Sequence, residues 1–100
     1  MLPKNRITAH PGEILIEEFL KPLDLSANAF AAALRVPPNR ITSIINGRRS
    51  ITGDTALRLA RYFGTTAEMW INLQAMHDLS RANVEAGAAI AREVKRRDAA

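Results

Sequence analysis

Apolar and polar positions recur at helical spacing along most of the 100-residue chain, and the strict alternation of β-branched residues that marks a strand is absent. Prolines and glycines interrupt this pattern at short intervals. The sequence therefore predicts an all-α fold of five or six helices. We expect helices from Pro11 to near Pro22, from Ser26 to about Leu34, from Pro38 to about Asn46, from about Thr52 to Gly64, from Thr65 to about Ser80, and beyond Ser80.

The apolar face of each predicted helix supplies candidate core residues. Ser26 is expected to cap the second helix, and Thr65 with Glu68 has the spacing of a capping box at the start of the fifth. Trp70 is expected in the core, with an interface to another protein chain as the alternative. The sixth helix has few apolar residues, so we expect it to be stable only when it packs against a partner. The expected core comprises Leu15, Phe19, Leu20, Phe30, Ala31, Leu34, Ile41, Ile44, Ile45, Leu57, Ala60, Phe63, Met69, Trp70, Leu73 and Met76.

Composition narrows the class of protein. With 47% hydrophobic and 24% charged residues, the chain is globular and long enough for one domain. It contains no cysteine, which excludes disulfides, thiolate zinc sites and cysteine nucleophiles. Its apolar runs are far shorter than the ~20 residues that cross a bilayer, and residues 1–10 lack the apolar core of a signal peptide. A cytoplasmic protein without a membrane segment is expected.

The net charge of +4 is concentrated in one segment of the chain. Residues 35–61 carry a net charge of +5, whereas the segments on either side are close to neutral. Every cation in this segment is an arginine, which forms forked hydrogen bonds with phosphates and with guanine edges. The alternative is a basic face that contacts only solvent. The segment contains Arg35, Arg40, Arg48, Arg49, Arg58 and Arg61, with Asp54 as its one acid.

The third predicted helix has an unusual outer face. Ile41, Ile44 and Ile45 form its apolar stripe. A turn of about four residues separates it from the second helix, which is helix-turn-helix geometry with the third helix in the position that reads DNA. Its outer face carries short hydrogen-bonding side chains suited to base edges: Asn39, Ser43 and Asn46, with Arg40 and Thr42 at the flanks.

Residues around this helix are candidates for phosphate contacts. Arg48 and Arg49 follow it directly, and Asn46 lies at its end. Ser26 and Asn28 lie at the start of the second helix, whose free N–H groups suit a phosphate. For Ser26 and Asn28, simple helix capping is the alternative.

Several motifs in combination resemble a known family. The segment from Ser26 to Gly47 resembles the helix-turn-helix of phage-repressor-like (Xre-type) regulators. The stretches HPGEIL at 10–15, GRRSIT at 47–52, DTALRLARYFG at 54–64 and WINLQ at 70–74 are similar to the HigA antitoxin family, also called VapI-like. The resemblance covers about residues 8–80.

This resemblance implies a lambda-repressor-like helix-turn-helix domain over residues 1–82, with 83–100 as a C-terminal helical tail of the same domain. It implies an antitoxin that forms a homodimer, binds double-stranded DNA at its own operator, represses its own operon and neutralises a HigB-type mRNA-cleaving toxin. It also implies that bases are read by Pro38, Asn39 and Ser43, with Arg40 and Thr42 alongside. Pro38 has no donor, so its contact would be apolar.

Two positions depart from the family's pattern. Arg35 stands where the family usually has glycine, so a positive φ there would strain the backbone. His77 stands where many relatives carry an aromatic residue, so we expect the fifth helix to pack somewhat differently.

Catalysis is not expected. The two histidines, His10 and His77, lie far apart in sequence, and no glycine-rich phosphate loop, nucleophile motif or metal-ligand spacing occurs. We therefore expect no cofactor and no metal. Two other functions stay open: a free-standing phage-type transcriptional regulator, and a protein-interaction inhibitor without significant DNA binding.

Overall fold

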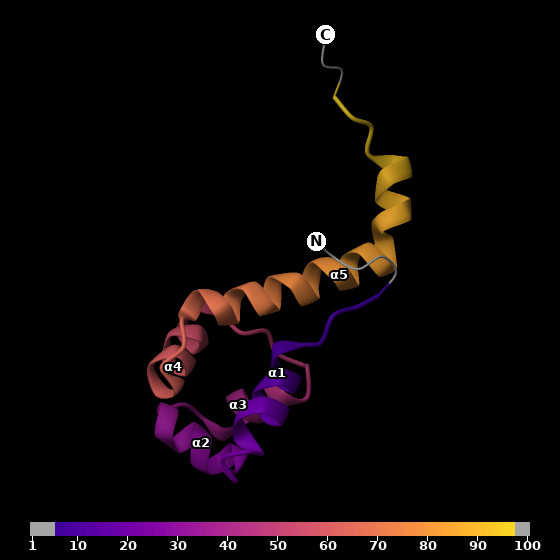
Figure 1. The fold of residues 1–100 in the computed structure, drawn as a ribbon. Coiled ribbons are helices and arrows are strands. Elements are labelled where there is room, and N and C mark those ends of the chain that lie inside the picture. Colours follow the sequence, from indigo (N-terminus) through magenta and orange to yellow (C-terminus); the bar gives the residue numbers. More distant parts are fainter. Residues whose placement is uncertain (1–5, 98–100) are drawn as a thin grey trace.

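The structure, a computed structural model, describes residues 6–97, and every regular element in that range is a helix (Figure 1). This confirms the expected all-α class. The elements are α1 (Pro11–Ile14), the π-helical η1 (Leu15–Leu20), α2 (Ala27–Leu34), α3 (Pro38–Ile45), α4 (Gly53–Phe63) and α5 (Ala67–Glu93).

The first helix is continuous but changes its winding. It begins after His10, whose Nδ1 accepts a hydrogen bond from the Gly12 amide at 2.9 Å. From Leu15 onward it is a π-helix, and the Lys21 amide donates to the Ile16 carbonyl oxygen five residues earlier at 2.9 Å. The predicted single helix ending near Pro22 is therefore present as α1 followed by η1.

The pair α2 and α3 forms the predicted helix-turn-helix. Ser26 caps α2 as expected, because its Oγ accepts a hydrogen bond from the Ala29 amide at 3.1 Å. At the other end Arg35 adopts the left-handed conformation, with φ of 59°, and the Val36 amide donates to the Ala31 carbonyl at 3.0 Å. The strained backbone expected at Arg35 is thus confirmed. Only three residues separate the end of α2 from Pro38, which begins α3.

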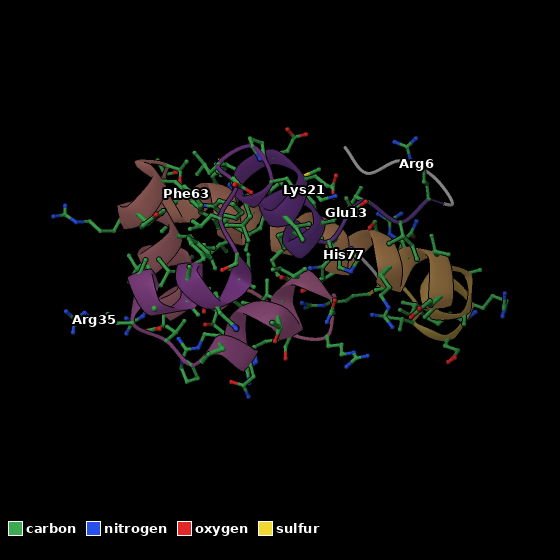
Figure 2. The ribbon with its side chains drawn as sticks, turned by 90° about the horizontal axis from the view of Figure 1, so that it is seen from below. Arg6, Glu13, Lys21, Arg35, Phe63 and His77 are labelled. Carbon is green, nitrogen blue, oxygen red and sulfur yellow. The ribbon has the colours of Figure 1, made fainter. Side chains whose placement is uncertain are left out.

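Aromatic rings form the centre of the core between the first helix, α2, α4 and α5. Phe63, labelled in Figure 2, packs against Phe19 with ring centroids 4.6 Å apart and against Phe30 at 5.3 Å. Phe19 contacts Trp70 at 5.2 Å. Trp70 is fully buried, and its Nε1 donates to Thr65 Oγ1 at 2.9 Å. The expectation that Trp70 belongs to the core is confirmed.

Two expectations about α4 and the start of α5 are wrong. Leu57 is 66% exposed, because α4 turns Thr55, Ala56 and Leu59 inward and leaves Leu57 on its outer side. Thr66, not Thr65, caps α5, since its Oγ1 accepts from the Met69 amide at 3.1 Å. The hydroxyl of Thr65 is used instead by the Trp70 indole.

The predicted fifth and sixth helices are one helix, α5, of 27 residues. Ser80 does not break it, because its hydroxyl donates to the His77 carbonyl within the helix at 2.8 Å and accepts from the Thr8 amide at 2.9 Å. Met76 is 43% exposed, contrary to its expected core position. The proposed division between residues 82 and 83 falls inside α5, and residues 1–5 and 98–100 of the two predicted segments lie outside the described residues.

The C-terminal turns of α5 stand clear of the other helices (Figure 1). Ile90 is 52% exposed and Val94, just beyond the helix, is 66% exposed. More than half of the surface of each residue is therefore uncovered within residues 6–97. Among the helices of that range, none combines the length and the hydropathy needed to cross a membrane.

Candidate DNA interface

The outer face of α3 presents most of the predicted base-reading residues together. Ile41 and Ile44 are fully buried, which fixes the opposite face of α3 outward. Pro38 and Asn39 are exposed in its first turn, and Thr42 and Ser43 are half-buried one turn later. These four residues therefore share one accessible face at the helix-turn-helix.

Arg40, predicted with them, is held differently. Its guanidinium donates to Asp54 Oδ1 in the first turn of α4 at 2.7 Å, and its side chain is 29% exposed. The guanidinium is thus engaged within the protein, on the side of α3 that faces α4. Sequence reasoning did not predict this contact, because Asp54 lies 14 residues away.

The loop after α3 fixes the two arginines predicted to bind phosphates. Gly47 makes the turn with φ of 73°. The Ser43 carbonyl oxygen then accepts hydrogen bonds from the amides of both Arg48, at 2.8 Å, and Arg49, at 3.2 Å. Both side chains are exposed. Arg48 and Arg49 therefore start from backbone that is attached to α3 itself.

The remaining predicted phosphate contacts lie at two helix ends. Ser26 and Asn28 are exposed at the start of α2, and the Ser26 hydroxyl makes the capping bond described above. Asn46 is exposed at the end of α3, where its backbone N–H donates to the Thr42 carbonyl oxygen at 3.0 Å.

Asp54 and Arg58 form a network that sequence reasoning missed. Arg58 Nε donates to Asp54 Oδ1 at 2.8 Å, and its Nη1 donates to the Leu34 carbonyl oxygen at the end of α2 at 2.9 Å. Hydrogen bonds from Arg58 and then Arg40 lower the pKa of the Asp54 carboxyl below its ordinary value. The i,i+4 spacing of Asp54 and Arg58 was the available signal for this pair.

The two histidines meet across the fold, although they are far apart in sequence. Their rings pack edge to face with centroids 5.0 Å apart. His10 Nδ1 accepts from the Gly12 amide, and His77 Nδ1 lies 2.7 Å from the Thr8 carbonyl oxygen, to which it donates. His77 thus attaches the segment before α1 to α5. Residues 6–97 contain no group of three His, Cys, Asp or Glu side chains placed to hold a metal ion.

Comparison with known proteins places this arrangement in a family. Residues 16–70 match the Helix-turn-helix family. Virulence-associated protein I of Dichelobacter nodosus is 58% identical over 80 residues, which are 79% of this chain and 74% of that protein.

Solved structures agree with that match. An addiction module antidote protein of the HigA family from Coxiella burnetii is 50% identical, with a TM-score of 0.86 over 92% of this chain and 100% of that one. The Pseudomonas aeruginosa antitoxin HigA, solved with the higBA promoter, is 42% identical, with a TM-score of 0.84 over 87% of this chain and 95% of that one. The lambda-repressor-like fold is thereby confirmed, and the family is not one of enzymes. The chain belongs to the helix-turn-helix family and, within it, to the HigA-type antitoxins.

Proposed function

We propose that this protein is a DNA-binding antitoxin that represses its own operon and neutralises a HigB-type mRNA-cleaving toxin. The observation that carries the DNA-binding part is the arrangement of α3: an accessible polar face opposite two buried isoleucines, with two exposed arginines attached at its end. The related Pseudomonas aeruginosa antitoxin was solved with promoter DNA. A protein acting on its own operon works in the cytoplasm.

In the proposed complex α3 enters the major groove. Asn39, Thr42 and Ser43 offer hydrogen-bonding groups to base edges, and Pro38 offers an apolar surface to a thymine methyl group. Arg48 and Arg49 contact flanking phosphates, together with Ser26, Asn28 and Asn46 at the helix ends. Asn or Ser side chains supply sequence discrimination, while the arginines supply sequence-independent affinity.

The protein is proposed to act as a homodimer with residues 1–82 as the DNA-binding unit and 83–100 as its tail. Two copies of α3 would then reach successive major grooves about 34 Å apart on a near-palindromic operator. An apolar groove of about 370 Å³ on the distal half of α5, which includes Leu79, Ala82, Gly87 and Ile90, is proposed to pack against a second copy.

Sedimentation equilibrium tests the dimer. The wild-type chain is expected to sediment as a dimer, and the double variant Leu79→Glu, Ile90→Glu as a monomer. Leu57→Glu, at a leucine of similar exposure on α4, serves as the control and should leave the dimer intact. A wild-type monomer at tens of micromolar would contradict the proposal.

Fluorescence anisotropy tests DNA recognition with a labelled duplex from the gene's own upstream region and a scrambled duplex. Asn39→Ala or Ser43→Ala should reduce operator affinity by about 1–3 kcal/mol and leave the scrambled duplex unaffected. Arg48→Ala should weaken binding to both duplexes and reduce the salt slope by about one. If Arg48→Ala left the affinity and the slope unchanged, the phosphate assignment would be wrong.

Co-expression tests the antitoxin role. The product of the neighbouring gene should arrest growth when expressed alone, and co-expression of this chain should restore growth. Operator binding without any rescue would instead identify a free-standing regulator. Rescue without operator binding would identify an inhibitor that acts on protein alone.

A further inference from the structure

Asp54 is the one acid in the basic segment 35–61, and it lies at the edge of the candidate DNA interface. Its Oδ1 accepts from Arg40 Nη1 at 2.7 Å and from Arg58 Nε at 2.8 Å. Arg40 comes from α3 and Arg58 from α4, so one carboxylate oxygen joins the recognition helix to the helix that follows it.

This carboxylate is fixed more firmly than an ordinary surface ion pair. Isolated exposed pairs are weak because two long side chains must lose their freedom to form them. Here Arg58 is already anchored by its bond to the Leu34 carbonyl at 2.9 Å, and it approaches Asp54 with two nitrogens, the second at 3.5 Å. Asp54 therefore presents a preset acceptor to Arg40.

Arg40, when paired with Asp54, lies close to a residue that is predicted to contact phosphates. Arg40 and Arg49 line the same hollow of about 250 Å³ beside the start of α4, together with Ser50 and Thr55. Arg49 is one of the predicted phosphate contacts. A guanidinium released from Asp54 would therefore stand next to Arg49, where it could reach the same phosphates that Arg49 is proposed to contact.

We propose that Asp54 limits the sequence-independent affinity of this protein for DNA by holding Arg40 away from the phosphates. The inference rests on the DNA-binding function proposed above. Phosphate contacts raise affinity for every sequence, so an additional free arginine strengthens binding to bulk DNA as well as to the operator. Asp54 keeps that contact unavailable and leaves recognition to the neutral side chains of α3.

A double-mutant cycle tests the proposal with Asp54→Asn, Arg40→Gln and the double variant, measured by anisotropy on operator and scrambled duplexes over a range of salt. Asp54→Asn is expected to bind both duplexes several-fold more tightly and to steepen the salt slope by about 0.9, the value for one added phosphate contact. Arg40→Gln alone should leave the salt slope unchanged, because Asp54 already keeps Arg40 from contacting phosphates. The double variant should show no gain over Arg40→Gln.

Matched controls separate this mechanism from two others. Glu93→Gln, at the end of α5, removes the same charge far along the chain and should leave binding unchanged. An equal gain in Glu93→Gln, or a gain that persists in the double variant, would show a general charge effect and overturn the proposal. Weaker operator binding by a folded Asp54→Asn would assign Asp54 a purely structural role and also overturn it.

The outcome for the wild-type chain keeps the two proposals apart. If wild type binds neither duplex, DNA binding fails and the inference fails with it. If wild type prefers its operator and the cycle shows no coupling, only the inference about Asp54 fails. Should Asp54→Asn not fold, Arg40→Gln still decides: a loss of about one in the salt slope, as expected for Arg48→Ala, would mean that Arg40 is a free phosphate contact.

Discussion

Gly12 in α1 lies directly against the backbone of Ile44 in α3. A Cβ placed on Gly12 would stand 1.8 Å from the Ile44 carbonyl oxygen and 3.0 Å from the Ile45 Cα. The first helix and the end of α3 thus approach too closely to leave room for a β-carbon at residue 12. The position of α3 depends on the missing side chain at residue 12.

Gly12→Ala should therefore destabilise the protein strongly. The obstructing atoms are backbone, so relief requires α1 and α3 to move apart and opens the buried contacts around Ile44. We expect a loss of about 3 kcal/mol in the free energy of unfolding, at the upper end of the usual cost of overpacking. Urea denaturation followed by circular dichroism measures it.

Gly53→Ala is the matched control for that variant. Gly53 begins α4, and a Cβ there would meet nothing within 4 Å. Its replacement should be neutral or stabilise by up to about 1 kcal/mol, because alanine restricts the unfolded chain. Equal losses in the two variants would contradict the steric explanation for Gly12.

Arg35→Gly should stabilise the protein. Arg35 has φ of 59° at the end of α2, and its side chain points outward into solvent (Figure 2). A left-handed conformation costs an L-residue about 1–2 kcal/mol, so glycine should raise the free energy of unfolding by about 1 kcal/mol. Thermal unfolding of Arg35→Gly and Arg35→Ala separates the causes. A similar gain with alanine would point to relief of charge repulsion among the arginines rather than of backbone strain.

Stability should decline in mildly acidic solution because of His10. Burial, and then the neighbouring His77, lower the pKa of His10 below its ordinary value of 6.5, although Asp78 and the Arg49 backbone act in the opposite direction. As the pH falls, the unfolded chain takes up the proton first, so this contribution is complete above about pH 6.5 and is lost as the pH falls through the lower folded-state pKa. Protonated Nδ1 also cannot accept from the Gly12 amide.

Urea midpoints measured between pH 8 and pH 5 test this dependence. His10→Asn provides the control, because asparagine can cap the same amide without titrating. Its stability should vary less over this range than that of the wild type. An identical pH profile for the two proteins would mean that other groups are responsible.

Thr65→Val should cost about 1–3 kcal/mol, because it leaves the buried Trp70 indole N–H without its acceptor. Thr66→Ala removes the cap of α5 and should cost about 1 kcal/mol. The two are distinguished by near-ultraviolet circular dichroism, in which Thr65→Val alone should change the tryptophan signal. A change in that signal for Thr66→Ala alone would reverse the assignment of the two hydroxyls.

The elements that could be predicted from sequence were those governed by local chemistry. The helix-turn-helix follows from the cap at Ser26, the stop at Arg35 and the proline that begins α3, each of which acts within a few residues. Leu57 could not be placed in the same way, because α4 carries several apolar residues and its contacts with the rest of the fold decide which of them face inward. The single helix α5 was missed because Ser80 satisfies its hydroxyl inside the helix instead of ending it.

In the candidate interface, too, features set within one helix could be predicted from the sequence, and contacts between helices could not. The outward face of α3 could be predicted because Ile41 and Ile44 form an apolar stripe that is buried on the opposite face. The pairing of Arg40 with Asp54 was not, since it joins side chains on two helices and depends on the angle at which those helices cross. The contact between the two histidines likewise depends on how the segment before α1 runs beside α5.

The two hydrogen bonds on the Ser43 carbonyl have a consequence for the DNA as well as for the protein. Because the backbone of Arg48 and Arg49 is attached to α3, the points from which these two side chains extend are fixed relative to the side chains proposed to read bases before DNA binds. In the proposed complex the DNA, rather than the protein backbone, must therefore change its shape to bring bases and phosphates to both sets of side chains. Operators whose groove width already matches this spacing would then be favoured, and base pairs that no side chain touches would contribute to that preference. In other operators, flexible pyrimidine–purine steps near the half-site would lower the free energy needed to deform the DNA.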